Sequence, residues 1–364
     1  MPVIIRRRRR YWIALVVILM MTSVAALLYV TRLGRTPPFR DASGGVLPGS
    51  VASMERVRLG GIEQSIVIRG RSAKAPILIW LHGGPGMDET GMWRRNNAAL
   101  EDHFLVVYWI QRGTGRSYDS AIPAASMRLS RFVADLDELV DLMRARFGQR
   151  RVVLVGHSWG TSIGVAYAQA HPDKVAAYVG VGQVVDAAEG ERRSYAFTLA
   201  EAARRHDAGA LADLRRIGPP PYPMSSLLVQ RGWLNRFGGA WHRPRDMPGL
   251  MWESFGASEV TLLDGITYAR GEEFSLDALE GDTAKVNWMR DATHFAMPVF
   301  IMAGRYDHNT DGQLQHEYFQ RITAPAKRFI WFEASAHSPP FEQAEAFNSA
   351  MIRDVLPVAI ARSR

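Results

Sequence analysis

The sequence contains no cysteine, and this absence excludes several kinds of chemistry. Disulfide bonds, thiol nucleophiles and thiolate metal sites all need cysteine, so none of them can operate in this chain. No two histidines stand at the helical spacing of metal ligands with an acid nearby, and we therefore predict no metal and no cofactor. The missing cysteine says nothing about the cellular compartment, because an exported protein can also do without it.

Acidic residues are absent from the first 35 positions, which hold seven arginines. Removing these seven charges from the formal net charge of +8 leaves +1 for the rest of the chain. The body of the protein is therefore nearly neutral, and the high isoelectric point gives no reason to expect nucleic acid as a partner. A hydrophobic content of 47% is typical of a globular protein with a sizeable core.

An uncharged run of 21 residues, Tyr11–Thr31, follows five consecutive arginines, Arg6–Arg10. A helix needs ~20 residues to cross a bilayer. We predict that residues 1–10 form a basic cytoplasmic tail and residues 11–31 a transmembrane anchor, which places the body on the extracytoplasmic side. The alternative is a signal peptide cleaved near the small residues Ser23–Ala25, in which case the body is secreted.

Residues 32–53 are rich in proline, glycine and serine and are predicted to be a linker. Two short strand patterns follow, Glu55–Leu59 and Ile62–Ile68, and the Gly60-Gly61 pair between them predicts a hairpin. Further along, apolar strands alternate with amphipathic helices. This alternation predicts an α/β fold with a mostly parallel sheet and helices on both faces.

The alternation lapses over residues 186–293, which are mostly helical in pattern and interrupted by glycine and proline. We predict a core made of residues 54–185 and 294–364, with residues 186–293 inserted as a helical cap over the functional site. A separate helical domain is the alternative interpretation of the same segment.

A G-x-S-x-G motif occupies Gly156–Gly160, between the apolar strand Val152–Val155 and a helical run. Strand, tight turn and helix in this order predict a nucleophile elbow that presents Ser158. The backbone N–H of Trp159 would then point toward the negative charge that forms on a substrate carbonyl oxygen. The alternative is a glycine-rich turn with an idle serine.

A serine nucleophile needs a base, and the base needs an acid that orients it. Asp307 and His337 each follow a predicted strand, in the chain order Ser, Asp, His that α/β-hydrolases use. His308 and Asp311 are local alternatives that fit the spacing less well. We interpret the remaining prominent histidines as structural or surface residues: His82, His157, His294 and His316.

The loop His82–Gly86 has the sequence H-G-G-P-G and follows another predicted strand. An oxyanion hole needs a second N–H donor besides Trp159, and the loop after such a strand supplies it. Gly83 or Gly84 can be this donor, because glycine lets a substrate approach the backbone. The sequence does not distinguish between the two glycines.

Taken together, these motifs and the Q-R-G-T-G-R-S loop at Gln111–Ser117 resemble the proline iminopeptidase group of α/β-hydrolases. The resemblance covers about residues 55–355 and implies the α/β-hydrolase fold, with Ser158 as nucleophile, His337 as base and Asp307 as orienting acid. Two features depart from the group: Ile110 stands where an acid precedes Q-R-G, and residues 186–248 show no familiar pattern.

The resemblance also implies a way to bind the free amine of a peptide. Proline-releasing members of the group use cap glutamates in W-E and A-R-x-E contexts, and Trp252-Glu253 and Ala269–Glu272 are similar. Glu253 and Glu272 are therefore candidate substrate-binding residues, because a cationic amine in a partly dry pocket needs carboxylates. Ordinary solvated acids on cap helices are the alternative.

Three functions fit the sequence. The first is a membrane-anchored serine hydrolase that releases N-terminal residues from short peptides or amides through an acyl-enzyme, as an aminopeptidase of the proline iminopeptidase type. The second is a carboxylesterase or lactonase that uses the same triad. The third is a non-catalytic binding protein on a hydrolase fold. The oligomeric state is not addressed by any pattern in the sequence.

Overall fold

The computed structural model describes residues 2–32, 34–243, 249, 253–261 and 264–363. Its centre is one sheet of eight strands in the order β1-β2-β4-β3-β5-β6-β7-β8. The strands are β1 Val51–Leu59, β2 Ile62–Gly70, β3 Ile77–Leu81, β4 Leu105–Ile110, β5 Val152–His157, β6 Val175–Val181, β7 Val299–Gly304 and β8 Lys327–Phe332. The predicted hairpin is present as the antiparallel pair β1–β2, and all pairings from β4 to β8 are parallel.

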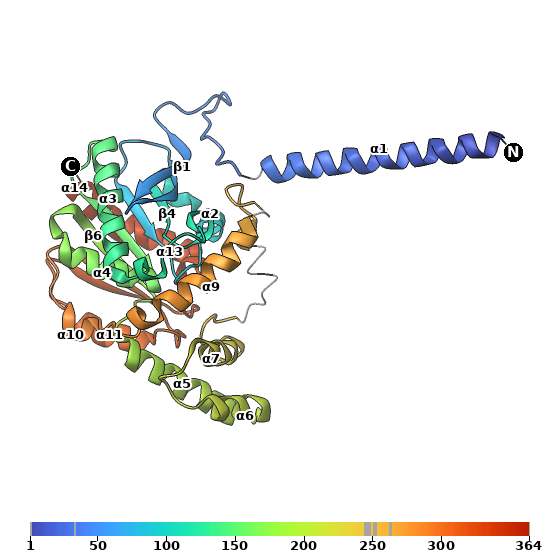
Figure 1. The fold of residues 1–364 in the computed structure, drawn as a ribbon. Helices are drawn as coiled ribbons and strands as arrows, with labels where there is room; N and C mark the ends of the chain where they lie inside the picture. Colours follow the sequence, from blue (N-terminus) through green and yellow to red (C-terminus); the bar gives the residue numbers. More distant parts are fainter. Residues whose placement is uncertain (1, 33, 244–248, 250–252, 262–263, 364) are drawn as a thin grey trace.

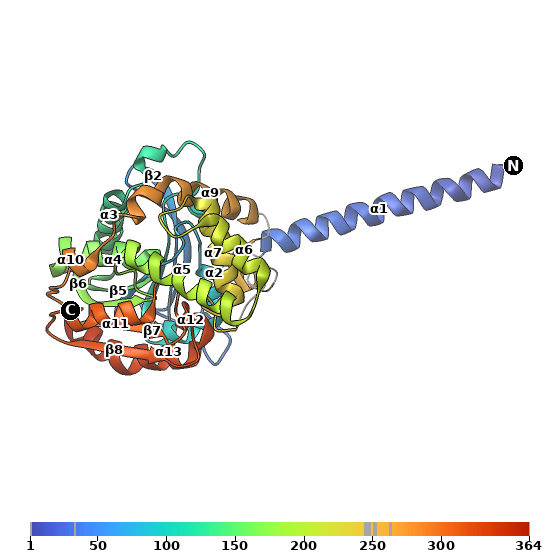
Figure 2. The ribbon, with the colours of Figure 1, turned by 90° about the horizontal axis from the view of Figure 1, so that it is seen from below.

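Helices cover both faces of the sheet, as predicted (Figure 1, Figure 2). After the N-terminal helix, the helices that lie outside the segment between β6 and β7 are α2 Thr90–Asn96, α3 Leu129–Phe147, α4 Trp159–Ala170, α11 Gly312–Arg321, α12 Pro339–Glu342, α13 Ala344–Ala350 and α14 Leu356–Arg362. Shorter helical turns are η1 Ala98–Asp102, η2 Gly115–Ser117, η3 Ala124–Ser126, η4 Pro172–Lys174 and the π-helical η5 Met351–Val355.

Alternation along the central strands builds two separate hydrophobic layers. In β3, Ile77, Ile79 and Leu81 face the layer that contains α3, α4 and α11. Leu78 and Trp80 face the opposite layer, which contains α2, α13 and α14. Because successive side chains of a strand point to opposite faces, a strand buried on both faces must be apolar throughout. For this reason the sequences of the central strands are unbroken runs of apolar residues.

The segment between β6 and β7 is helical, with α5 Ala187–Arg204, α6 Ala208–Ile217, α7 Met224–Arg236, α9 Asp264–Thr283 and α10 Trp288–Asp291. Helices α5, α6 and α7 share a small hydrophobic cluster of their own. They lie together at one side of the sheet in both ribbon views. The division into core and cap stays a prediction, and Trp252 lies outside the described residues.

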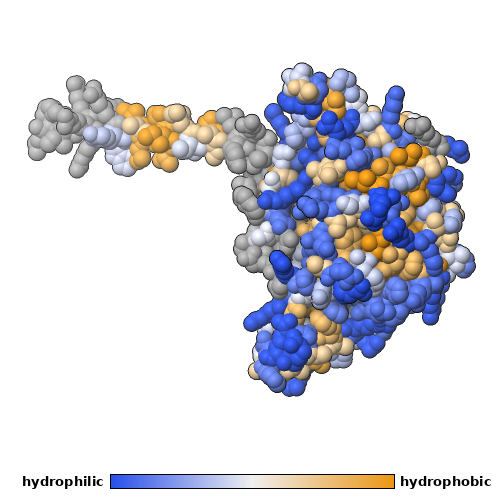
Figure 3. Space-filling model, turned by 180° about the vertical axis from the view of Figure 1, so that it is seen from behind, coloured by the Kyte–Doolittle hydropathy of each residue, from blue (hydrophilic) through white to orange (hydrophobic). Residues whose placement is uncertain are grey.

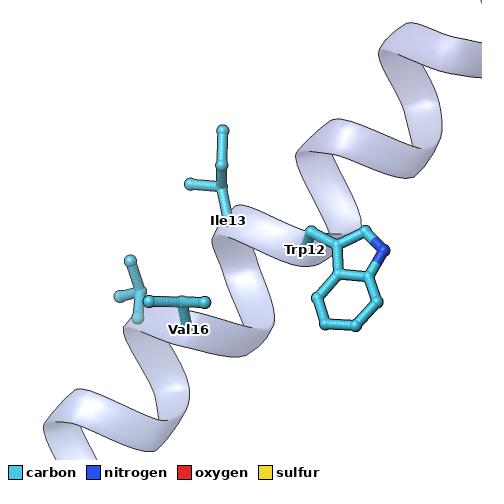
Figure 4. A pocket seen from close by; sticks show the side chains of 4 residues that line it. Trp12, Ile13 and Val16 are labelled. Carbon is cyan, nitrogen blue, oxygen red and sulfur yellow. The ribbon is translucent and has the colours of Figure 1, made fainter.

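Helix α1, Pro2–Arg32, extends away from the body of the protein. Its described side chains are exposed, with Trp12 at 67% and Val16 at 55%, and Figure 4 shows Trp12, Ile13 and Val16 projecting from the helix. Apolar residues dominate the part of α1 that Figure 3 colours. The predicted membrane span is not confirmed: within the part of the chain that the structure describes, no helix is long and apolar enough to cross a membrane.

Both ends of the segment predicted as a linker are bound to the body of the protein. The Arg35 N–H donates to the Ser258 carbonyl at 3.0 Å, and the Thr36 hydroxyl donates to Glu259 Oε1 at 2.7 Å. The Arg69 guanidinium donates to Thr36 and to the Pro37 carbonyl. β1 begins at Val51, inside the predicted linker. Composition alone missed these contacts because their partners lie on distant elements.

A very close backbone approach joins α4 to the sheet. A Cβ added to Gly160 would lie 2.0 Å from the Leu81 carbonyl oxygen, and one added to Gly156 would lie 2.7 Å from the Gly160 carbonyl oxygen. Both distances are far below van der Waals contact, and the neighbouring atoms are backbone that cannot turn aside. Only glycine therefore lets α4 begin directly above the end of β3.

Gly160→Ala should lower the free energy of unfolding by about 3 kcal/mol, because overpacking against fixed backbone forces the helix away from the sheet. Gly232→Ala, in the exposed middle of α7 where a Cβ meets nothing within 4 Å, is the matched control and should leave stability unchanged or raise it by up to ~1 kcal/mol. Urea denaturation measures both. Equal stability of the two variants would contradict the close crossing.

Candidate active site

The sharp turn between β5 and α4 places Ser158 at the carboxyl edge of the sheet, in the predicted strand–turn–helix arrangement. Ser158 has φ 51° and ψ −121°, a backbone conformation that residues with a side chain rarely adopt. Its N–H donates to the Val181 carbonyl at 3.0 Å, and its carbonyl accepts from the Thr161 hydroxyl at 2.6 Å. Such backbone strain costs on the order of 1–3 kcal/mol and persists only where other interactions of the folded protein hold the residue in place.

Asp307 and His337 come together beside this turn. The His337 Nδ1 and Asp307 Oδ2 atoms are 3.1 Å apart. The Asp307 carboxylate also accepts from Gln315 Nε2 at 2.9 Å and from the Thr310 hydroxyl at 2.8 Å. Burial opposes its ionisation, but His337 and the donors of Thr310 outweigh this and hold the pKa of Asp307 below its usual range. A charged carboxylate therefore faces the imidazole ring.

The other ring nitrogen of His337, Nε2, makes no contact within the described chain that would occupy it. His337 Nε2 is buried and has no hydrogen-bond partner among the described residues. The ring packs against Gly182, where an added Cβ would lie 2.9 Å from His337 Nδ1. The hydrogen bond to Ser158 is therefore not formed in this structure, and catalytic hydrogen bonds often tighten only when substrate binds.

The H-G-G-P-G loop lies directly against Ser158. A Cβ added to Gly83 would be 3.2 Å from the Ser158 Cβ. The Gly83 N–H, however, already donates to Glu89 Oε2 at 3.2 Å. No hydrogen bond among the described residues engages the Gly84 N–H, and Gly84 adopts φ 112°. The geometry thus favours Gly84 over Gly83 as the second oxyanion donor. The first donor is Trp159, which lies in the first turn of α4, where a backbone N–H has no acceptor within the helix.

Sequence reasoning missed an acid–histidine pair behind the nucleophile. His157 Nδ1 lies 2.6 Å from Glu89 Oε1, and both side chains are buried. His157 Nε2 lies 3.2 Å from the His337 carbonyl oxygen. Burial lowers the pKa of His157, but the neighbouring Glu89 outweighs burial, and the pKa of His157 is raised overall. The only signal in the sequence was a histidine inside the G-x-S-x-G motif, and nothing there pointed to Glu89.

Glu272 approaches the site on α9. A Cβ added to Gly86 would lie 2.8 Å from the Glu272 Cα, so α9 packs on the H-G-G-P-G loop. Burial raises the pKa of the Glu272 carboxyl, which has no hydrogen bond or ion pair with any described residue. Glu253 differs, because it already has an interaction partner within the protein. Its neighbour Ser254 packs against Gly91 at the start of α2.

The alternative acid and base have structural contacts. The Asp311 carboxylate caps α11 by accepting from the Leu314 N–H at 2.8 Å and pairs with Arg193 at 3.1 Å. The His308 ring stacks on Phe197, with ring centroids 3.6 Å apart. Neither contact includes Ser158. Among the residues with described coordinates, no three histidine or acidic side chains gather as a metal site would need.

Comparison with known proteins shows the family and the fold. Residues 76–220 match the model of the α/β-hydrolase fold family. The chain is 30% identical over 307 residues to a protein of Bacillus subtilis named "probable aminopeptidase YbaC", a match that spans 84% of this chain and 96% of that protein. It is 25% identical over 292 residues to a proline iminopeptidase of Heyndrickxia coagulans, spanning 77% and 90% of the two chains.

A solved structure shows the same fold. The proline iminopeptidase-related protein of Thermus thermophilus superposes with a TM-score of 0.63 at 20% identity, covering 86% of this chain and 99% of the other.

Proposed function

Because the chain belongs to the α/β-hydrolase family and resembles its proline iminopeptidases, we propose that it is a serine hydrolase that releases N-terminal residues from short peptides or amides. The observation that carries this proposal is the convergence of a strained Ser158, a His337–Asp307 pair and a glycine loop at one edge of the sheet. None of these groups is close to another in the sequence.

The reaction proceeds through an acyl-enzyme. Ser158 Oγ attacks the substrate carbonyl carbon while His337 Nε2 takes its proton, and Asp307 stabilises the imidazolium that forms. The oxyanion accepts hydrogen bonds from the Trp159 and Gly84 N–H groups. His337 then gives its proton to the leaving amine. Water next attacks the acyl carbonyl carbon while His337 Nε2 takes its proton, and His337 returns that proton to Ser158 Oγ as the bond to the acyl group breaks and the acid leaves.

Glu272 supplies the feature that selects a peptide N-terminus. Its carboxylate is partly buried, lacks a partner among the described residues and sits on the helix that packs against the oxyanion loop. Leaving a carboxylate there without a counter-charge is costly, and a substrate ammonium group would offset that cost. Glu253 has a partner already and is the weaker candidate for the same task.

We also propose that α1 attaches the protein to a membrane, with the N-terminus cytoplasmic and the catalytic body on the extracytoplasmic side. Support comes from the exposed apolar side chains of Tyr11–Leu27 and from the arginines that precede them in the sequence. Arginine-rich segments next to an apolar helix remain on the cytoplasmic side.

A fluorophosphonate probe should label the wild-type protein and fail to label Ser158→Ala, because only an activated serine reacts with it. Ser162→Ala, one turn further along α4, is the matched control and should keep full labelling. A panel of proline and other aminoacyl amides beside short-chain esters then identifies the substrate. Absence of labelling in the folded wild-type chain would favour the non-catalytic binding protein, and turnover of esters alone would favour the esterase or lactonase.

Glu272→Gln should raise the KM for an aminoacyl amide by roughly 10- to 100-fold, because a hydrogen bond to a charged group contributes about 1.5–3 kcal/mol. An ester without an amine should be hydrolysed as before. Glu273→Gln changes the neighbouring exposed acid on α9 and is the matched control, expected to alter neither reaction. Steady-state kinetics on both substrates measure the effect, and an unchanged KM for the amide would refute amine binding by Glu272.

The full chain should sediment with membranes and resist extraction by alkaline carbonate, whereas a chain starting at Arg35 should stay in the supernatant. Mass spectrometry of the recovered full chain distinguishes an intact anchor from a signal peptide removed near Ser23–Ala25. Recovery of the intact full-length chain in the supernatant would rule out both the anchor and the signal peptide.

A further inference from the structure

The elements that carry the candidate site meet at one buried pair, Glu89 and His157. Glu89 is 2% exposed and His157 is 4% exposed. Glu89 Oε2 accepts from the Gly83 N–H in the oxyanion loop, and Glu89 Oε1 meets His157 Nδ1 at 2.6 Å. On its other side, His157 Nε2 faces the carbonyl oxygen of His337 at 3.2 Å. The pair therefore joins the oxyanion loop, the elbow and the loop of the base.

The partners of His157 determine its protonation. His157 Nε2 faces the His337 carbonyl oxygen at 3.2 Å and, at the longer distance of 3.4 Å, the Ser338 hydroxyl, which can donate or accept. A carboxylate oxygen and a carbonyl oxygen only accept hydrogen bonds, so the shortest contact of each ring nitrogen favours a proton on that nitrogen. A neutral ring would leave one nitrogen lone pair pointing at an oxygen. The Gly83 N–H favours the ionised form of Glu89, because it donates to Oε2. Contacts on both sides of the ring thus select the imidazolium.

We propose that Glu89 and an imidazolium form of His157 are a positioning pair, which fixes the loop of His337 relative to the oxyanion loop and the elbow. This inference rests on the proposed hydrolase function and extends it to residues that do not touch the substrate. The pair acts through the backbone of His337 and Gly83. A displacement of about 1 Å between the base and the oxyanion donors is enough to slow the reaction on the order of 100-fold.

The charged groups around His157 are consistent with this state. Glu89 and Asp307 favour the positive charge of His157, and His157 in turn lowers the pKa of the nearby His82. His337 contributes its backbone carbonyl and also its titratable ring, whose centroid lies 5.1 Å from that of His157. The rings of Trp80 and Phe341 enclose the imidazole without charge. Burial lowers the pKa of His82, which keeps that ring neutral and leaves His157 as the cation of the cluster.

The sign of the pH dependence follows from the raised pKa of His157. A free histidine has a pKa of about 6.5, so the contribution of the pair is complete below that pH and is lost as the pH rises through the higher pKa of the folded state. Wild-type kcat should therefore decline on the alkaline side as His157 loses its proton.

Glu89→Gln tests the pair with a side chain of the same shape. The amide can accept from Gly83 and donate to a neutral His157, so the fold should persist while the charge is removed. We expect kcat to fall roughly 10- to 100-fold with little change in KM, and the alkaline decline to disappear. Glu89→Asp keeps the carboxylate and should retain the alkaline decline.

A matched control is available at the far end of α4. Asp137 and His171 form an acid–histidine contact of 3.5 Å in a more exposed place, and Asp137→Asn should leave kcat and its pH profile unchanged. If Glu89→Gln is folded and behaves like this control, the positioning role is overturned.

Nuclear magnetic resonance of the His157 ring in the wild-type chain separates the two proposals. A doubly protonated ring at pH 7 is expected, and a neutral ring overturns the pair whatever the activity. A wild-type chain that carries the doubly protonated ring and yet takes no fluorophosphonate label overturns the hydrolase function instead. The ring measurement needs no variant, so it holds even if Glu89→Gln fails to fold.

Discussion

The close crossing of α4 over the end of β3 is the constraint on which the rest of the site depends. Gly160 sits where a Cβ would lie 2.0 Å from the Leu81 carbonyl oxygen, so the chain must turn within one residue of the end of β5. That residue is Ser158, and the turn forces it to φ 51°. The same turn aims the first N–H groups of α4 at the space beside Ser158, where helix N-termini favour negative charge. The position of Ser158, its strained backbone and the N–H groups directed beside it thus all result from the close crossing of α4 over β3.

Hydrogen bonds to two carboxylates, the buried Asp307 and the half-buried Glu342, hold the loops around this turn. The Asp307 carboxylate accepts hydrogen bonds from Thr310 and Gln315 and faces His337 Nδ1. Glu342 accepts from the N–H groups on either side of His337, those of Ala336 and Ser338. Hydrogen bonds to charged acceptors are directional and roughly twice as strong as neutral ones, so they can hold a loop in a single arrangement. Preorganised donors and charges of this kind are what stabilise a developing oxyanion.

Hydrogen bonds also connect the helical segment between β6 and β7 to the loops that carry Asp307 and His337. Glu342 also accepts from the His242 N–H at 2.6 Å, and the carbonyls of Gly239 and Ala240 accept from the His308 and His337 N–H groups. The stretch after α7 is therefore bonded through its backbone to the loops of both Asp307 and His337. A ligand that shifts this stretch would act on the base directly, because no flexible side chain intervenes.

Features set by local patterns could be predicted from the sequence, and features set by distant partners could not. The elbow was predictable because Gly156, Ser158 and Gly160 stand together between a strand and a helix. The pairing of Asp307 with His337 followed from chain order alone, since parallel strands bring their carboxyl ends to one edge. In contrast, the roles of Gly83 and Gly84 differ only because Glu89 occupies one N–H, which no pattern in H-G-G-P-G reveals.

The contact of α9 with the oxyanion loop decides what the site can select. Small residues make this contact, because a Cβ added to Gly86 would lie 2.8 Å from the Ser275 Cβ and 3.0 Å from the Gly271 carbonyl oxygen. The same two residues of α9 also contact the Gln111–Ser117 loop, where the Ser275 hydroxyl donates to the Gly113 carbonyl at 3.0 Å. Their size brings the helix axis close to the loops and holds Glu272 at the edge of the site, where burial raises its pKa. Ile110 stands where the resemblance to the proline iminopeptidase group implies an acid, so under the proposed function fewer carboxylates remain to recognise an amine. Under the proposed function, selectivity for a free N-terminus depends mainly on the Glu272 carboxylate, whose position is set by the packing of Gly271 and Ser275 on the neighbouring loops.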